Sequence, residues 1–130
     1  MPRTTDRQVT RLLLVVDDAA EICELVFEML TPHGFTVLTA TEGRDAVERF
    51  RQAADRIQAV LLDLVMPGMP GATVFREIHR LRPDVPVILL TGVTERKALE
   101  SVAGLPVAGY ILKPFLREPL LAKVREVLGD

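Results

Sequence analysis

The sequence contains no tryptophan, one tyrosine and one cysteine. Since five phenylalanines are the only other aromatic residues, the core must be built mainly from aliphatic side chains. The single cysteine, Cys23, cannot form an intramolecular disulfide, which favours a reducing compartment. No apolar run approaches the roughly 18 residues of a membrane span, and the opening MPRTTDRQVTR lacks the apolar centre of a secretory signal. We therefore expect a cytoplasmic protein that does not contact a membrane.

An excess of charge is also missing, because 16 basic and 18 acidic side chains give a net charge of −2. A chain without a basic surplus has no electrostatic footprint for nucleic acid. The 130 residues, 48% of them hydrophobic, suffice for one domain with a sizeable core. We expect residues 1–11 to form a flexible lead-in and residues 12–130 to form that domain.

The rest of the chain alternates between short apolar runs and segments with helical hydrophobic spacing. Uninterrupted apolar runs are typical of parallel strands buried on both faces. Strands are expected at residues 12–16, 35–40, 59–62, 87–90 and 108–112. Helices are expected between Asp18 and Pro32, from 41 or 42 to 50, and at 73–81, 95–102 and 116–128. This (βα)5 pattern predicts an α/β fold, with a parallel sheet covered on both faces by right-handed crossovers.

The first helix carries the most detailed predictions. Asp18 is a candidate N-cap, with Glu21 three residues later as its capping-box partner. The inward stripe is expected to consist of Ile22, Leu25, Val26, Met29 and Leu30. Phe27 falls outside this stripe, so it either packs against the last helix or is exposed for a partner.

Polar residues stand where the predicted strands end. Asp17 and Asp18 follow the first strand, Asp63 follows the third, and Thr91 and Lys113 follow the fourth and fifth. Each could be only a turn or cap residue, the commoner role of an isolated aspartate after a strand. The carboxyl ends of parallel strands meet at one edge, however, so all five are expected to share a site. Three converging carboxylates repel one another unless a cation is bound, and oxygen ligands favour Mg²⁺.

Four segments carry a resemblance to a known family. VVDD ends the first predicted strand, LLDLVMPGMPG the third, LLTG the fourth and YILKPF the fifth. Together they resemble the receiver domain of bacterial response regulators, over residues 12–128. The resemblance implies a flavodoxin-like, doubly wound sheet of strand order 2-1-3-4-5. It also implies Mg²⁺-dependent phosphoryl transfer to Asp63 from the histidine of a sensor kinase or phosphotransfer protein, which switches a protein-interaction surface.

The resemblance also implies roles for the other site residues. Lys113 and Thr91 are implied to contact phosphoryl oxygens, with a cis peptide before Pro114, and Tyr110 is implied to act as a rotating aromatic switch. In receiver domains the phosphodonor docks on the first helix, which favours a contact role for Phe27. The implied Mg²⁺ ligands are Asp17, Asp18, Asp63 and the backbone carbonyl of Val65.

The expected module is a phosphoacceptor that catalyses its own phosphorylation and dephosphorylation, not an enzyme with an external substrate. Its expected partners are a sensor histidine kinase or histidine phosphotransfer protein and a downstream protein, without nucleic acid. It is expected to be a monomer or a weak, phosphorylation-dependent dimer. The sequence ends after the last predicted helix, so no output module is expected. A single-domain chemotaxis or relay protein and the receiver of a hybrid histidine kinase are both compatible with this pattern.

Two alternative functions are disfavoured by particular residues. A Mg²⁺-dependent phosphatase with an aspartyl-phosphate intermediate requires a second acid two residues after its nucleophile. That position is Val65 after Asp63 and Ala19 after Asp17, so neither carries an acid. A flavodoxin-type flavin or nucleotide binder requires a Gly-rich or Ser/Thr-rich phosphate loop after the first strand. Here that loop reads Asp-Asp-Ala-Ala, which repels phosphate.

Two valines depart from the family pattern. Val65 and Val93 stand where many receiver domains carry a polar side chain, and neither can orient a hydrolytic water. We therefore expect slow loss of the phosphoryl group. The two histidines, His33 and His79, are expected to be ordinary surface residues.

Overall fold

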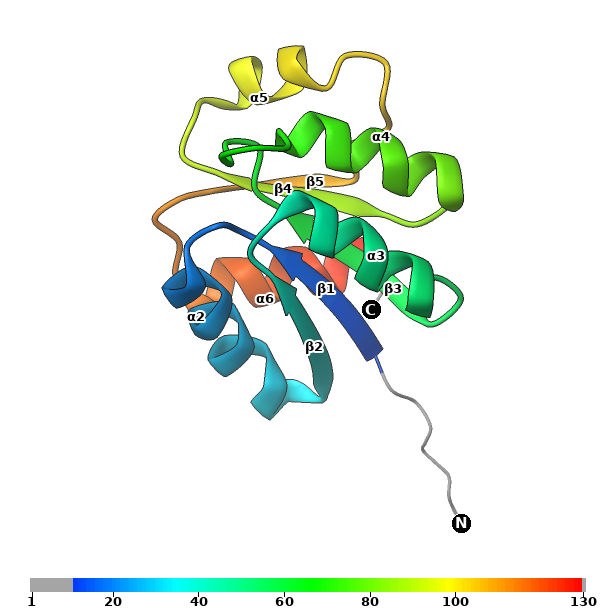
Figure 1. Ribbon diagram of the computed structural model, residues 1–130. Helices are drawn as coiled ribbons and strands as arrows, with labels where there is room; N and C mark the ends of the chain where they lie inside the picture. Colours follow the sequence, from blue (N-terminus) through cyan, green and yellow to red (C-terminus); the bar gives the residue numbers. More distant parts are fainter. Residues whose placement is uncertain (1–10, 130) are drawn as a thin grey trace.

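The computed structural model describes residues 11–129, which form one five-stranded sheet with helices on both faces (Figure 1). All strands run parallel in the order β2-β1-β3-β4-β5. The predicted α/β class and strand order are confirmed. The expected lead-in lies outside the described residues except for Arg11, which is the first residue of β1. The first strand therefore begins one residue earlier than predicted.

Every predicted helix and strand is present, and β3 begins earlier than expected because Ile57 is buried although the polar Gln58 interrupts the apolar run. Within residues 11–129, no helix has the length and apolar character needed to cross a bilayer. The strands are β1 (Arg11–Val16), β2 (Phe35–Ala40), β3 (Ile57–Leu62), β4 (Val87–Thr91) and β5 (Gly109–Leu112). The helices are α2 (Ala20–Leu30), a 3-10 turn η1 (Thr31–His33), α3 (Gly43–Ala53), α4 (Gly71–Leu81), α5 (Glu95–Ser101) and α6 (Arg117–Leu128).

The sheet separates two hydrophobic clusters. Because successive side chains of a strand point to opposite faces, neighbouring residues of β1 and β3 join different clusters. Leu14 and Val60 pack with residues of α3, α4 and α5, whereas Leu13 and Leu61 pack with residues of α2 and α6. The two groups of helices lie on opposite faces of the sheet (Figure 1). The central strands are thus buried on both faces, which explains their uninterrupted apolar sequence and makes them a rigid support for the residues at their ends.

The start of α2 differs from the prediction. Ala19 occupies the N-cap position, and no side chain caps the helix. Asp18 is therefore not the N-cap, and Glu21 has no capping-box partner. Instead, Oδ1 of Asp17 accepts a hydrogen bond from the Ala19 amide at 2.9 Å.

The inward face of α2 is also rotated from the predicted stripe. Cys23 is 3% exposed, whereas Leu25, predicted to be buried, is 38% exposed. Since Cys23, Val26 and Leu30 are spaced i, i+3 and i+7, they define a buried face whose far side carries Leu25. The prediction for Leu25 was therefore wrong.

Arg82, the residue after α4, fixes the end of the sheet opposite to the predicted site. Its Nη1 donates hydrogen bonds to the carbonyl oxygens of Ala54 and Ile57, and its Nε contacts Asp84 Oδ1 at 3.1 Å. One guanidinium thus joins the end of α3 to the start of β3.

Candidate functional site

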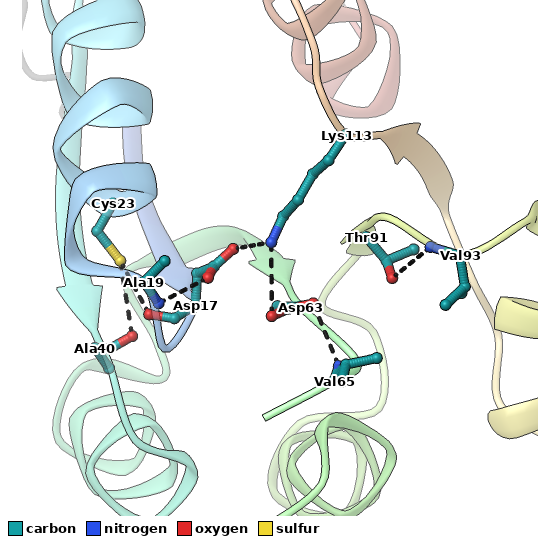
Figure 2. A network of polar contacts seen from close by, with 9 residues as sticks. All are labelled: Asp17, Ala19, Cys23, Ala40, Asp63, Val65, Thr91, Val93 and Lys113. Atoms are coloured by element: carbon teal, nitrogen blue, oxygen red, sulfur yellow. Dashed lines mark hydrogen bonds and ion pairs between the residues drawn. The ribbon is translucent and has the colours of Figure 1, made fainter. Parts of the chain in front are cut away.

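Residues from four strands converge at the carboxyl edge of the sheet (Figure 2). Asp17 follows β1, Asp63 follows β3, Thr91 ends β4 and Lys113 follows β5. Asp17 and Thr91 are fully buried, and Asp63 is 4% exposed. The structure therefore places these four residues at the same edge of the sheet.

The acidic cluster comprises all three predicted aspartates. One carboxylate oxygen from each of Asp17, Asp18 and Asp63 lies within 4.8 Å of the others. Asp18 is exposed, whereas the other two are buried. The cluster thus has a solvent-facing side through which a small ion or a phosphoryl group can enter.

Two of the polar side chains also stabilise their own loops. Asp63 Oδ1 accepts a hydrogen bond from the Val65 amide at 3.3 Å. Thr91 Oγ1 accepts one from the Val93 amide at 3.3 Å. The turn roles that the sequence allowed for isolated residues are therefore fulfilled alongside the convergence, and they hold each side chain in position.

Lys113 supplies the positive charge of the site. Its Nζ lies 2.5 Å from Asp17 Oδ2 and 3.6 Å from Asp63 Oδ2. The Lys113–Pro114 peptide bond is cis, as the resemblance implied. The ammonium is only partly accessible, since the Lys113 side chain is 22% exposed. It therefore contacts both buried carboxylates and is closer to Asp17.

The electrostatics of the site favour protonation of Asp63. Burial, and next the negative charge of Asp17, raise the pKa of Asp63 to about 6, although Lys113 acts in the opposite direction. A carboxyl group with a pKa of about 6 is still mostly ionised above pH 7. Asp63 is therefore available as a carboxylate, at a cost in folding free energy.

The donor atoms fit a hard divalent cation. The cluster offers carboxylate oxygens only, the ligand type that Mg²⁺ prefers. Asp17 Oδ2 is buried and is paired with the Lys113 ammonium at 2.5 Å. Val65, whose backbone carbonyl was predicted as a further ligand, lies in the loop after Asp63 with its side chain 64% exposed.

Sequence reasoning missed the part played by the backbone of Val93. The carbonyl of Val93 accepts a hydrogen bond from the hydroxyl of Tyr110, while its amide donates to Thr91. Tyr110 is half-buried against the cluster of α3, α4 and α5. One residue of the β4–α5 loop therefore links the two predicted switch residues, Thr91 and Tyr110.

Cys23 is a second residue whose position the sequence did not suggest. Its Sγ lies 3.5 Å from the carbonyl oxygen of Asp17 and 3.9 Å from that of Ala40 (Figure 2). Burial, and next the charge of Asp17, raise the pKa of the thiol to about 11, so it stays protonated at neutral pH. Cys23 packs beneath the site as a neutral group.

The remaining candidates lie away from the acidic cluster. Phe27 is 46% exposed and borders a groove between α2 and β2. His33 is exposed in η1, and His79 is half-buried in the last turn of α4. Neither histidine belongs to the acidic cluster.

Comparison with known proteins agrees with this geometry. The family model for the response regulator receiver domain matches residues 13–125. The response regulator MprA of Mycolicibacterium vanbaalenii is 37% identical over 118 residues, which cover 89% of this chain and 49% of that protein. The chain spans about half the length of the curated relatives that it matches.

Solved structures agree over nearly the whole chain. The chemotaxis protein CheY4 of Vibrio cholerae has a TM-score of 0.84 at 27% identity, with 92% of this chain and 99% of that chain covered. The receiver domain of the sensor histidine kinase PA1611 from Pseudomonas aeruginosa has a TM-score of 0.83 at 26% identity, with 94% and 100% covered. That structure contains a magnesium ion coordinated in its active site cleft.

The doubly wound sheet and the matched sequences define a signalling module of the two-component type. The chain belongs to the response regulator receiver domain family.

Proposed function

We propose that this domain accepts a phosphoryl group on Asp63 from the phosphohistidine of a sensor kinase or of a phosphotransfer protein. The observation that carries the proposal is the position of Asp63, a buried carboxylate at the end of β3 with the Lys113 ammonium 3.6 Å from its Oδ2. Phosphoryl transfer requires an in-line nucleophile and neutralisation of the equatorial oxygens. Asp63 provides the nucleophile, and Lys113 and the Thr91 hydroxyl provide donors for those oxygens.

In the transfer step, a carboxylate oxygen of Asp63 forms a bond to phosphorus while the bond from phosphorus to the histidine nitrogen breaks. The electron pair of the broken bond returns to the imidazole ring. Because the ionised carboxylate carries no proton, no general base is needed. Attack of water on the acyl phosphate later releases inorganic phosphate and restores Asp63.

Mg²⁺ is the cofactor that we propose for the acidic cluster, with Asp17, Asp18, Asp63 and the backbone carbonyl of Val65 as ligands. The oxygen-only donor set and the magnesium ion in the PA1611 receiver domain support this assignment. When bound, Mg²⁺ neutralises negative charge on the phosphoryl oxygens.

Acetyl phosphate with Mg²⁺, followed by intact-mass measurement, tests the proposed function directly. We expect the wild-type protein to gain one phosphoryl group and Asp63→Asn to gain none. Asp55→Asn, which changes an exposed aspartate before β3, should label like the wild type. Equal labelling of Asp63→Asn and the wild type would show that another residue is the acceptor.

The proposed partners are the phosphodonor and a downstream protein, contacted by a cytoplasmic monomer or weak, phosphorylation-dependent dimer. The α2 surface supports a protein contact, because Phe27 is exposed beside acidic side chains. Glu21, Glu24 and Glu28 form no ion pair with a basic side chain among residues 11–129. A donor with a basic, partly apolar docking surface suits this helix.

Slow loss of the phosphoryl group is expected from the two valines. Val65 is 64% exposed and Val93 is half-buried, and neither side chain can orient the attacking water by a hydrogen bond. A single orienting hydrogen bond is typically worth about 1–1.5 kcal/mol, or roughly tenfold in rate. We expect Val65→Asn to speed decay of the phosphorylated protein about tenfold, measured after removal of acetyl phosphate.

Leu99→Asn, at an exposed apolar position of α5, is the control for a simple change in polarity and should leave the decay rate unchanged. Because the proposed ligand at position 65 is the backbone carbonyl, Mg²⁺ affinity should be unchanged in Val65→Asn. An equal or slower decay in that variant would contradict a role for position 65 in setting the lifetime.

Thr91 is expected to transmit phosphorylation to Tyr110. A phosphoryl oxygen offers the Thr91 hydroxyl a hydrogen-bond acceptor that the unmodified site lacks, and only such a difference can shift a conformational equilibrium. Movement of Thr91 then acts on Val93, which holds the Tyr110 hydroxyl. Thr91→Ala should accept phosphate but lose the phosphorylation-induced NMR shifts around Tyr110. A full set of these shifts in Thr91→Ala would disprove the coupling.

A further inference from the structure

Residues 64–70 form the loop that leads from Asp63 to α4. Leu64, at the start of this loop, is 8% exposed and packs into the hydrophobic cluster on the α3 and α4 side of the sheet. At the end of the loop, the Gly71 amide donates a hydrogen bond to the Leu64 carbonyl oxygen at 3.1 Å. The stretch between them has less support, because Met69 is half-buried and the residues on either side of it are exposed. The position of this stretch therefore depends on what Met69 packs against.

Met69 lies against Gly43, the first residue of α3. A Cβ atom added at Gly43 would lie 2.8 Å from Met69 Cβ and 3.1 Å from Met69 Cγ. Gly43 is buried and its φ is not positive, so its backbone conformation does not require glycine. The missing side chain instead lets the loop approach the start of α3, which runs beside α4 (Figure 1).

The nearest atom of Met69 is its Cβ, which is attached directly to the loop backbone. Rotation of the Met69 side chain moves Cγ but leaves Cβ in place, so a larger residue at position 43 requires the loop or α3 to move. Met69 is only four residues after Val65, whose amide donates a hydrogen bond to Asp63 Oδ1 at 3.3 Å. A shift of the loop at Met69 therefore reaches the backbone beside Asp63.

We propose that Gly43 and Met69 are positioning residues for the phosphoacceptor loop. Packed against each other, they hold the loop so that the backbone of Val65 keeps its place next to Asp63. The inference rests on the proposed function, in which the Val65 carbonyl is a metal ligand. It adds a contribution from α3, a helix that supplies no residue to the acidic cluster.

The first test measures Mg²⁺ binding to Gly43→Ala by calorimetry. We expect the dissociation constant to rise about tenfold, the lower end of the loss caused by changing a residue that orients metal ligands. Labelling by acetyl phosphate should be slow at low Mg²⁺ and return to the wild-type rate at saturating Mg²⁺, because the side chains of the site are unchanged. Ala53→Gly, at a buried position at the other end of α3, is the control. It weakens the helix but should bind Mg²⁺ within about twofold of the wild type.

The second test approaches the same contact from the loop, so it holds even if Gly43→Ala does not fold. Met69→Ala keeps Cβ and removes the rest of the side chain, which loosens the loop without a clash. Mg²⁺ binding should weaken, though less than in Gly43→Ala. Met29→Ala is the matched control, because Met29 is a half-buried methionine of α2 that packs on the other face of the sheet. Its Mg²⁺ affinity should equal that of the wild type.

The third test needs no metal. In metal-free protein, the NMR signal of the Val65 amide reports its hydrogen bond to Asp63 Oδ1. This signal should shift in Gly43→Ala and Met69→Ala and stay in place in the two control variants. A general loss of stability would not produce a shift that is confined to this loop.

The outcomes separate this inference from the proposed function. If the wild type binds Mg²⁺ and both Gly43→Ala and Met69→Ala bind it equally well with an unmoved Val65 signal, the positioning role is disproved and the metal site stands. If the wild type itself binds no Mg²⁺, the metal site fails, and the Val65 signal alone decides whether the contact positions the loop. Weaker binding and a shifted Val65 signal in the two variants, with both controls unchanged, support the inference.

Discussion

Asp63→Asn is expected to stabilise the metal-free protein by about 3 kcal/mol at pH 7.5, which corresponds to a rise of roughly 10 °C in melting temperature. Burial and the neighbouring Asp17 raise the pKa of Asp63 from 3.8 to about 6, so its charged form is disfavoured in the folded state. Asparagine has a similar shape and no charge to bury. Urea denaturation in the presence of a chelator measures the difference.

The pH dependence of this stabilisation has a defined sign. The folded state binds the Asp63 proton more tightly than the unfolded state, so stability from this group is fully present below about pH 4 and is lost as pH rises through about 6. The gain from Asp63→Asn should therefore be small at pH 4 and complete by pH 7.5.

Two comparisons complete this experiment. Asp55→Asn, at an exposed position, should change stability by less than about 0.5 kcal/mol. Mg²⁺ should stabilise the wild type by mass action and should stabilise Asp63→Asn less. Destabilisation by Asp63→Asn at pH 7.5, or a gain that is independent of pH, would mean that Asp63 is not strained by its buried neighbours.

Gly71→Ala is expected to destabilise the fold by about 3 kcal/mol or more, at the upper end of overpacking effects. Gly71 is the first residue of α4, and a Cβ atom there would lie 2.2 Å from the carbonyl oxygen of Asp63 and 2.5 Å from the Cα of Leu64. Both neighbours are backbone atoms, so no side-chain rotation can relieve the contact. The α4 start must move away from the loop that holds Asp63.

Gly92→Ala is the matched control for this substitution. Gly92 is exposed, its φ is not positive, and nothing lies within 4 Å of an added Cβ. We expect its stability to stay within about 0.5 kcal/mol of the wild type, whereas Gly71→Ala also loses labelling by acetyl phosphate. Equal stabilities of the two variants would contradict the close approach of Gly71 to the Asp63 backbone.

The sequence predicted the sheet because its central strands are buried on both faces, and such strands leave a clear apolar pattern. It predicted the meeting of Asp17, Asp63, Thr91 and Lys113 because parallel topology alone brings strand ends together. Both predictions depend on the burial of whole strands and on their parallel direction, which the apolar runs and the alternation of strands with helices indicate.

Other features could not be read from the sequence because they depend on local geometry. The N-cap is Ala19 and not Asp18, and the buried face of α2 includes Cys23 and not Leu25. The link through Val93 is made by backbone atoms, which every residue possesses, so its side chain gave no indication. The closer approach of Lys113 to Asp17 than to Asp63 depends on ångström-scale distances.

The hydrogen bonds of Arg82 have a consequence for the phosphoacceptor at the other end of β3. Each strand residue adds about 3.3 Å, and a hydrogen-bonded strand cannot stretch, so a strand anchored at its first residue also has its last residue placed. Arg82 holds the carbonyl of Ile57, where β3 begins, and Asp63 comes directly after the strand. By holding the first residue of β3, Arg82 also helps to set the position of Asp63 at the other end of the strand. A slip of one residue at this anchor would turn the carboxylate to the opposite face of the sheet.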